Sequence, residues 1–415
     1  MSPFAYRNGI LHAEGVPLPQ IAADHGTPCY VYSRAALESA YAAYGRALAG
    51  RNALVCYAVK ANSNLAILNL FARAGAGFDI VSGGELARVI AAGGEPAKVV
   101  FSGVGKSREE MRSALEVGIL CFNVESAAEL DTLDDVAGSL NRRAPVSLRV
   151  NPDVDPKTHP YIATGLKSTK FGIPFEDALP LYRRAGKMRN VDIRGIDCHI
   201  GSQLLDPAPA AEAAAKLLGL VDALTAEGII LSHIDVGGGM GIRYRDEAAP
   251  TAEAYLAPLL RVLAGRREKL LFEPGRSLVG NAGLLLARVR TLKHGSGKNF
   301  AVVDAAMNDL ARPALYDAWH DMVAVRAAAT VEPRRYEVVG PICESGDFLG
   351  HGRDLALSEG DLLAIMSAGA YGMVMSSNYN TRPRAAEIVV DGDKTFVVRE
   401  RERIEQLFAN EHVLP

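Results

Sequence analysis

Short apolar runs alternate regularly with helical patterns over residues 30–276, and this alternation leaves few possible folds. Eight such runs occur, each rich in β-branched or other apolar residues. They are ALVCYAVK (53–60), GFDIVS (77–82), KVVFSG (98–103), LCFNVE (120–125), VSLRVNP (146–152), IRGIDCHIGS (193–202), LSHIDVGGG (231–239) and LLFEPGR (270–276). Strands that alternate with helices predict a parallel sheet, and eight evenly spaced units predict a closed (β/α)8 barrel of the α/β class. A doubly wound open sheet is the alternative.

The stretch 33–50, SRAALESAYAAYGRALAG, illustrates the connecting helices. Ser33 is a suitable N-cap and Gly50 a suitable end for a helix. Four apolar residues recur at helical spacing on one face, namely Leu37, Tyr41, Tyr44 and Leu48. This periodicity predicts an amphipathic helix that covers the sheet.

After residue 277 the pattern changes to strands separated by Gly, Asp and Pro turns. The predicted strands lie in GLLLARVRTLKH, KNFAVVDAAM, RRYEVVGPICES, DLLAIMSAGAYG, AEIVVDG and KTFVVRER. This pattern predicts a second, β-rich domain of barrel or sandwich type at 277–415. An Asn-Gly hairpin signal stands near the N-terminus, so we expect residues 1–30 to join that second domain. The barrel would then be an insertion at 31–276.

Composition limits the class of partner. The chain has 415 residues and a net charge of −3, which gives no electrostatic reason to expect nucleic acid or an anionic membrane. No apolar run approaches the length of a membrane span, and the first residues do not have the pattern of a signal peptide. The five cysteines are scattered, without a CxxC pair, and favour reduced thiols in a cytoplasmic protein.

The candidate site follows from the barrel, because active sites of such barrels lie at the carboxyl ends of the strands. The residues at these ends are nearly all polar or glycine. They are Lys60, Asp79, Ser82, Ser102, Asn123, Glu125, Arg149, Asn151, His199, Ser202, Gly237, Gly238, Gly239, Glu273 and Arg276. A ring this polar predicts a binding site for a charged small molecule.

Three residues of this ring and its glycine run suggest specific chemistry, although each also has an ordinary structural interpretation. Lys60 alone would be a solvated strand-end lysine, but a desolvated amine in a polar ring can form a Schiff base. His199 is either a hydrogen-bonded structural histidine or an imidazole stacked on a flat ligand. The glycines of 236–241 form either a tight turn or a phosphate cradle. Glu273 either pairs with Arg276 or shares a proton with a ring nitrogen.

Together, a Schiff-base lysine, a phosphate cradle, a stacking imidazole and a carboxylate for a ring nitrogen are what pyridoxal 5′-phosphate requires. At these points the sequence resembles the barrel-type, alanine-racemase-like pyridoxal-phosphate enzymes, and most closely the diaminopimelate decarboxylase family. The matching stretches are YAVKAN (57–62), GFDIVSGGEL (77–86), HPYIATGLKSTKFGI (159–173), CHIGSQ (198–203), DVGGGMGI (235–242), EPGRSLV (273–279), MNDLARPALYDAWH (307–320), GPICESGDFLG (340–350) and GAYGMVMSSNYN (369–380).

The resemblance implies a carboxy-lyase that converts meso-2,6-diaminopimelate to L-lysine and carbon dioxide, the last step of lysine biosynthesis. Lys60 would carry the cofactor as a Schiff base. The cofactor-binding residues implied are Lys60, Asp79, His199, Ser202, Gly237, Gly238, Gly239, Glu273, Gly275, Arg276 and Tyr371. The acidic Glu273 would keep the ring nitrogen protonated, which favours decarboxylation over racemisation.

The resemblance also implies a homodimer with shared active sites, in which Cys343 and Glu344 come from the partner chain. Cys343 would protonate the product carbon, whereas its ordinary interpretation is a buried inert thiol. Substrate recognition would fall to Arg276, Arg312, Tyr316, Glu344 and Tyr371. A planar bidentate cation suits the distal carboxylate of the substrate, and Glu344 suits its distal ammonium. No metal is expected.

Several alternatives remain at this point. The enzyme could act on another basic amino acid that lacks a distal carboxylate, namely D-ornithine, D-lysine, arginine or ornithine. It could be a catalytically silent cofactor-binding homologue, which predicts loss of Lys60 or Cys343. It could be a hydrolase with Glu125 and Glu273 as paired acids. The polar segment 152–168 is either a lid over the barrel mouth or a static loop.

Overall fold

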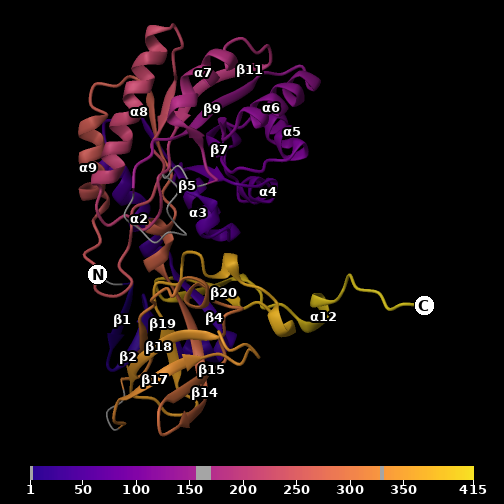
Figure 1. Cartoon of the computed structure of the whole chain (residues 1–415). Helices are drawn as coiled ribbons and strands as arrows, with labels where there is room; N and C mark the ends of the chain where they lie inside the picture. The colour runs from indigo at the N-terminus through magenta and orange to yellow at the C-terminus, as the bar shows by residue number, and fades with distance from the viewer. Residues whose placement is uncertain (1–2, 156–169, 328–330) are drawn as a thin grey trace. The chain divides into compact units, whose positions relative to one another are not determined.

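The computed structural model describes the whole chain except residues 1–2, 156–169 and 328–330. The chain divides into two compact units (Figure 1). The barrel unit consists of Ala40–Ile242 and Ala248–Ser277. The β unit consists of Met1–Ser39, Arg243–Glu247 and Leu278–Pro415.

The barrel unit is built on eight parallel strands. They are β5 (Ala53–Ala58), β6 (Gly77–Ile80), β7 (Val99–Phe101), β8 (Cys121–Val124), β9 (Ala144–Asn151), β11 (Val191–Asp197), β12 (His233–Asp235) and β13 (Lys269–Phe272). Neighbours in sequence are neighbours in the sheet, and β13 pairs with β5, so the sheet closes. The short β10 (Ile173–Pro174) adds to β9. The predicted (β/α)8 barrel is therefore confirmed, and the open sheet is excluded.

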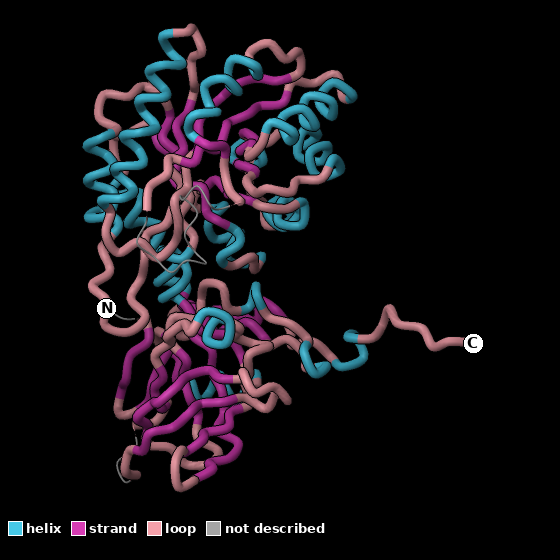
Figure 2. Tube along the Cα trace, viewed as in Figure 1, coloured by secondary structure: helices cyan, strands magenta, loops and turns pink. Residues whose placement is uncertain are grey.

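Helices follow the strands and surround the barrel, as the tube view shows (Figure 2). They are α2 (Arg34–Ala47), α3 (Leu65–Arg73), α4 (Gly83–Ala91), α5 (Arg108–Val117), α6 (Ala127–Ser139), α7 (Phe175–Ala185), α8 (Ala208–Ala226) and α9 (Ala252–Val262). The predicted cap of α2 is confirmed, because the Ala36 N–H donates to Ser33 Oγ at 3.1 Å. Leu37 and Tyr44 are buried, as the periodicity predicted.

The interior of the barrel changes character along the strands. An apolar cluster fills the amino-terminal half, namely Leu54, Cys56, Val100, Cys121 and Leu271. Because side chains on one face of a strand recur every second residue, Asn123 follows Cys121 and Glu273 follows Leu271 into the interior. The apolar half thus forms a packed floor beneath a polar half at the carboxyl ends of the strands.

The β unit contains a sheet with the order β18-β17-β15-β14-β4-β20-β21, and β19 pairs with β14 and β16. Its strands are β4 (Cys29–Ser33), β14 (Gly283–His294), β15 (Asn299–Val303), β16 (Met322–Ala324), β17 (Arg334–Val339), β18 (Phe348–Leu355), β19 (Leu362–Ile365), β20 (Ala386–Asp391) and β21 (Lys394–Arg399). All six strands predicted after residue 277 are present. The prediction missed β4, β16 and β18.

The N-terminal hairpin is also present, formed by β1 (Phe4–Arg7) and β2 (Ile10–Ala13). Asn8 and Gly9 have φ of +50° and +75°, as the left-handed turn of such a hairpin requires. The short β3 (Val16–Pro17) and α1 (Leu18–His25) follow. No helix among the described residues is long and apolar enough to span a membrane.

Candidate active site

Lys60 lies in a single 3-10 turn directly after β5, at the carboxyl end of the barrel. Its Nζ donates to Asp79 Oδ2 at 2.7 Å, and Asp79 comes from the end of β6. The Asp79 side chain is fully buried, whereas the Lys60 side chain is 35% exposed. The ion pair therefore fixes the amine at the barrel mouth and leaves part of it accessible, which is unlike a freely solvated surface lysine.

His199 follows β11 and presents a neutral imidazole. Burial lowers its pKa well below the ordinary value, and the positive charges of Arg149 and Lys60 add to this shift. Its Nδ1 accepts a hydrogen bond from the Gly238 N–H at 3.2 Å, so the ring proton is on Nε2. A neutral, oriented imidazole of this kind can stack on a flat ligand.

The glycines after β12 are required by close backbone packing. A Cβ on Gly238 would lie 2.0 Å from Glu273 O, and Gly237 has a φ of +67°. The Gly237 N–H donates to Asp235 Oδ1 at 2.9 Å, which ties the turn to the strand end. No side chain fits here, so the backbone itself lines this part of the mouth.

Arg276 begins the short helix α10 (Arg276–Val279) after β13. Its Nε and Nη2 donate to Ser202 Oγ at 3.2 and 3.0 Å. A Cβ on Gly275 would lie 3.1 Å from the Cβ atoms of Ala58 and Ala61, on either side of Lys60. These contacts bring the ends of three strands together around the amine, with donors suited to a phosphate.

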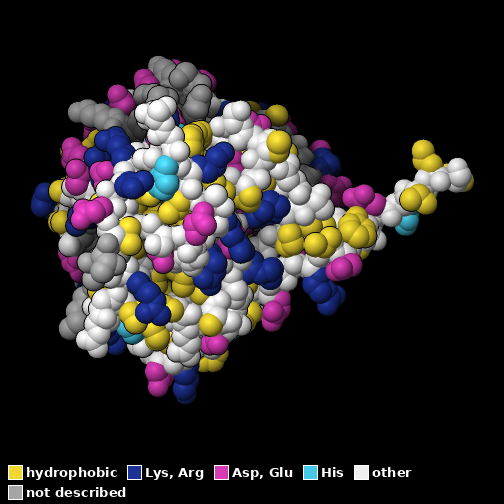
Figure 3. Space-filling model, turned by 90° about the horizontal axis from the view of Figure 1, so that it is seen from below, with side chains coloured by type: hydrophobic (Ala, Val, Ile, Leu, Met, Phe, Trp, Pro, Cys, Tyr) yellow, Lys and Arg dark blue, Asp and Glu magenta, His cyan; other side chains and the backbone are white. Residues whose placement is uncertain are grey.

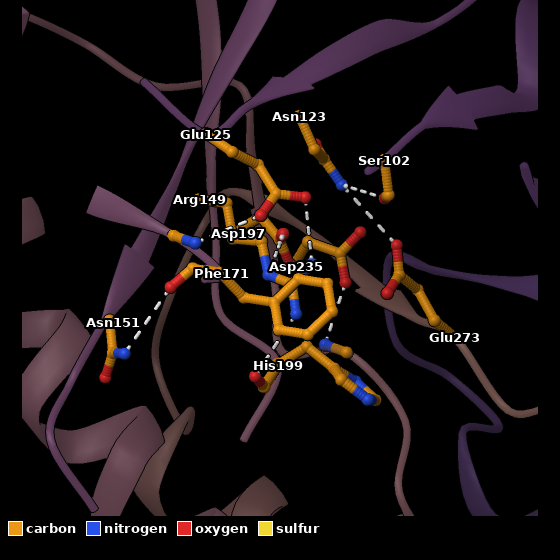
Figure 4. A network of polar contacts seen from close by, with 12 residues as sticks. Ser102, Asn123, Glu125, Arg149, Asn151, Phe171, Asp197, His199, Asp235 and Glu273 are labelled. Atoms are coloured by element: carbon orange, nitrogen blue, oxygen red, sulfur yellow. Dashed lines mark hydrogen bonds and ion pairs between the residues drawn. The ribbon is translucent and has the colours of Figure 1, made fainter. Parts of the chain in front are cut away.

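Three buried carboxyl groups form the base of the mouth, namely Asp197, Asp235 and Glu273 (Figure 4). Each offers an oxygen within 4.8 Å of the others. Burial raises the pKa of Glu273 well above its ordinary value, and the neighbouring Asp235 raises it further. Burial likewise raises the pKa of Asp235 to about 7. Oxygen clusters of this kind can hold a cation, but the raised pKa values favour carboxyls that share protons at neutral pH.

These raised pKa values predict a pH-dependent stability. A carboxyl with a raised folded-state pKa keeps a proton that the unfolded chain releases, so stability falls as pH rises between about 4 and 7. In the cofactor-free wild type, the free energy of unfolding should therefore fall when pH rises from 5 to 8. In Asp235→Asn we expect this fall to be about 3 kcal/mol smaller. Urea unfolding at both pH values measures this difference, and the exposed Asp24→Asn serves as the control. A pH dependence in Asp235→Asn equal to that of the wild type would contradict the argument.

Asp197 and Asp235 were not among the predicted site residues. Asp197 is the last residue of β11 and Asp235 the last residue of β12, each two positions before a predicted residue, His199 or Gly237. The predicted strands end later than the observed ones, so the prediction passed over these two acidic residues. Ser82, by contrast, was included in the polar ring, yet it caps α4 by accepting the Glu85 N–H at 3.2 Å.

Glu125 is held by several donors. Its Oε1 accepts from Arg149 Nη1 at 3.0 Å and from the Gly103 N–H at 2.8 Å. Its Oε2 accepts from the Gly172 N–H at 3.0 Å. A carboxylate bound by a guanidinium and two backbone donors is poorly placed to transfer a proton, which argues against the paired-acid hydrolase.

The remaining predicted site residues belong to the β unit. Cys343 is exposed, and its N–H donates to Asn380 Oδ1 at 2.9 Å. Because Cys343 is exposed, its interpretation as a buried inert thiol is wrong. The other four cysteines are buried free thiols. Glu344 is exposed beside it, and its Oε1 accepts from the Gly346 N–H at 3.3 Å. The thiol and carboxylate are thus adjacent and accessible in this unit.

Arg312 and Tyr316 lie at the two ends of helix α11 (Arg312–Tyr316). Arg312 is 8% exposed, and its guanidinium lies 4.7 Å from the centre of the Tyr244 ring. Tyr371 has a φ of +55°, a strained conformation for a bulky residue and one that tends to occur at functional sites. Of the predicted lid, only 152–155 is described, and the rest of 152–168 lies outside the described residues.

The sequence matches a protein family and several known enzymes. Residues 34–280 match the family described as "Pyridoxal-dependent decarboxylase, pyridoxal binding domain". The chain is 61% identical to a diaminopimelate decarboxylase of Pseudomonas aeruginosa over 415 residues, which is the full length of both chains. The family model spans the barrel and its flanking residues, whereas the relative matches the whole chain.

Solved structures agree with these relatives. A diaminopimelate decarboxylase from Helicobacter pylori complexed with L-lysine superposes with a TM-score of 0.92 at 42% identity, covering 95% of this chain and 99% of the other. A diaminopimelate decarboxylase from M. jannaschii in co-complex with L-lysine superposes with a TM-score of 0.95 at 37% identity, covering 99% and 98%. Both similarities extend over the barrel and the β unit.

Proposed function

This chain belongs to the diaminopimelate decarboxylase family, and from that premise we propose that its barrel mouth decarboxylates meso-2,6-diaminopimelate to L-lysine and carbon dioxide. The observation that carries the proposal is the partly exposed Lys60 side chain, whose amine is held 2.7 Å from the buried Asp79 beside three buried carboxyl groups. The reaction is the last step of lysine biosynthesis and uses pyridoxal 5′-phosphate. We place it in the cytoplasm, where free thiols are stable.

The donor set of the barrel mouth fits this cofactor. A primary amine, a neutral imidazole and a proton-carrying carboxyl match its aldehyde, its ring face and its ring nitrogen. Lys60, His199 and Glu273 would hold these three parts. The phosphate would be held by Ser202 and Arg276 together with the backbone of Gly237, Gly238, Gly239 and Gly275, and by the Tyr371 hydroxyl. When bound, the cofactor supplies a conjugated ring that withdraws electrons from the carbon that loses carbon dioxide.

Each residue around that ring would have a separate role. Asp79 orients the Lys60 amine through the ion pair. Glu273 Oε1 accepts a hydrogen bond from Asn123 Nδ2 at 3.5 Å, and its raised pKa favours a carboxyl that would share a proton with an aromatic nitrogen. His199 would cover one face of the ring and exclude water from it. Together these groups stabilise negative charge that develops during carbon dioxide loss.

Substrate recognition and the final protonation involve the β-unit residues. Arg276, Arg312 and Tyr316 bind the distal carboxylate, since a planar guanidinium matches a carboxylate in a bidentate manner. Glu344 binds the distal ammonium, and Tyr371 lines the substrate. The Cys343 Sγ–H delivers a proton to carbon after carbon dioxide leaves. An exposed thiol beside a carboxylate is suited to that role.

We assign the catalytic state to a homodimer whose sites are shared, with Cys343 and Glu344 supplied by the partner chain. The functional domains are then a cofactor-binding barrel at 31–276 and a β domain at 277–415 that residues 1–30 complete. Exposed apolar side chains support association, because a soluble monomer rarely leaves such groups clustered. Figure 3 shows apolar side chains along the C-terminal arm (residues 400–415), where Ile404, Phe408, Val413 and Leu414 are exposed.

Shared sites predict complementation between inactive variants. Lys60→Ala and Cys343→Ala are each expected to be inactive as pure dimers. After mixing and subunit exchange, each hybrid dimer would carry one doubly defective site and one intact site. We expect about a quarter of the wild-type activity, because half of the dimers are hybrids with one working site. Activity that stays at the level of the unmixed variants, despite proven exchange, would contradict shared sites.

The function itself is tested by an absorbance spectrum of the purified protein, repeated with meso-diaminopimelate while released carbon dioxide is trapped. A visible cofactor band together with stoichiometric carbon dioxide and L-lysine is the expected result. A band without carbon dioxide from diaminopimelate, but with carbon dioxide from D-lysine, D-ornithine, ornithine or arginine, would move the substrate to another basic amino acid. No band after incubation with pyridoxal phosphate would refute the proposal.

A further inference from the structure

His320 is a completely buried histidine that contacts Arg312 within the β unit. Its Nε2 lies 2.9 Å from Arg312 Nη1. Its Nδ1 lies 2.9 Å from the carbonyl oxygen of Met366, just after β19. The imidazole therefore bridges a guanidinium and a backbone carbonyl, with one ring nitrogen on each.

These two contacts determine the proton positions on the ring. A carbonyl oxygen can only accept, so Nδ1 must carry the hydrogen and donate it to Met366. A guanidinium can only donate, so Nε2 must present its lone pair to Arg312. His320 is thus held as one neutral tautomer, and protonation of Nε2 would place two donors against each other.

Other contacts fix the ring and the guanidinium in place. The His320 carbonyl accepts a hydrogen bond from Arg353 Nη2 at 3.0 Å, which anchors the backbone. The Tyr244 ring meets the His320 ring edge-on, with centres 5.3 Å apart and planes at 82°. Tyr244 also faces the Arg312 guanidinium at 4.7 Å. Arg312 is therefore oriented by an aromatic face and by a hydrogen bond to a fixed acceptor.

We propose that His320 is a positioning residue that aims Arg312 at the distal carboxylate of the substrate, and so determines the preference for amino acids that carry that group. The inference rests on the proposed function, in which Arg312 binds this carboxylate. One N–H of the guanidinium is held by His320, and this fixes the plane in which the others point. Bidentate binding of a carboxylate depends on that plane.

The test compares ligands with and without the distal carboxylate. L-lysine retains this group, whereas cadaverine, the diamine left when the carboxylate is removed, does not. We expect His320→Phe to weaken L-lysine binding about 10- to 100-fold and cadaverine binding less than about 3-fold. Calorimetry on the holoenzyme measures both dissociation constants. In turnover, KM for meso-diaminopimelate should rise by more than kcat falls.

Two further variants separate positioning from folding. His320→Gln keeps one donor and one acceptor and should recover most of the L-lysine affinity, whereas His320→Phe keeps only the ring shape. In a double-mutant cycle with Arg312→Met, the two effects on L-lysine binding should not add, because His320 acts through Arg312. The exposed His294→Phe is the matched control in the same unit.

These measurements separate failure of the His320 proposal from failure of the proposed function. If the wild type binds L-lysine and releases carbon dioxide from diaminopimelate, the proposed function stands whatever His320→Phe does. Equal weakening of L-lysine and cadaverine in folded His320→Phe, or additive effects in the cycle, would overturn the positioning role. If the wild type binds neither ligand and does not decarboxylate diaminopimelate, the proposed function itself fails.

Discussion

Lys60→Ala should lower kcat for decarboxylation by about 10⁴-fold or more, because under the proposed function this substitution removes the amine that would carry the cofactor. The structure supplies a second reason for a large effect. Asp79 is fully buried beneath that amine, and its Oδ1 has no hydrogen-bond partner among the described residues. Without Lys60, an uncompensated carboxylate would remain at the centre of the mouth. Trapped carbon dioxide and the visible cofactor band measure the loss.

Lys60→Arg is the matched control for this prediction. It restores a cation beside Asp79 but cannot form a Schiff base with an aldehyde. We expect it to recover part of the thermal stability lost in Lys60→Ala while remaining equally inactive. If either variant decarboxylates diaminopimelate within about tenfold of the wild-type rate, Lys60 is not the attachment point.

Glu273→Gln should lower kcat by about 10²- to 10³-fold with a smaller change in KM. Glutamine keeps the shape of the side chain and can still hydrogen-bond, but it cannot share a proton or carry charge beside a ring nitrogen. The carboxyl stabilises charge that develops only in the transition state, so its loss should lower kcat more than it changes KM. Steady-state rates across pH 6 to 9 measure it. A kcat within about threefold of the wild type would show that no such carboxyl is needed.

Glu125→Gln provides the comparison that tests the remaining hydrolase interpretation. Glu125 binds Arg149 and two backbone N–H groups, so we expect its loss to destabilise the barrel more than it slows catalysis. Unfolding midpoints and kcat, measured together for both variants, separate these effects. Equal losses of kcat from Glu125→Gln and Glu273→Gln would indicate a pair of catalytic acids.

The barrel could be predicted from sequence because its signals are local. Each strand is a short apolar run with a polar end, and each helix has its own caps and periodicity, so the pattern repeats without any knowledge of tertiary contacts. The strand Gly283–His294 could be predicted in the same way, because its apolar run is continuous in sequence. The polar ring followed from topology, since parallel strands place all carboxyl ends at one edge.

Features that depend on distant contacts could not be predicted. β4 is five residues long and merges with the following helix, so only its partners β14 and β20 define it as a strand. β18 contains two glycines and several polar residues and lacks apolar alternation. His320 gave no signal beyond its place in a motif, because its significance arises from contacts with Arg312 and Met366. Tertiary packing decides such elements.

The position of β4 between β14 and β20 has a consequence for how the protein is made. The ribosome synthesises β4 about 250 residues before its first partner strand. At about 5–20 residues per second, this strand waits roughly 12–50 s for β14. During that interval the barrel has the time to fold, while CYVYS, wholly buried in the finished sheet, remains an unpaired apolar edge. A fragment that begins at residue 278 would lack this central strand permanently, so the C-terminal sheet should not form as an independent product of expression.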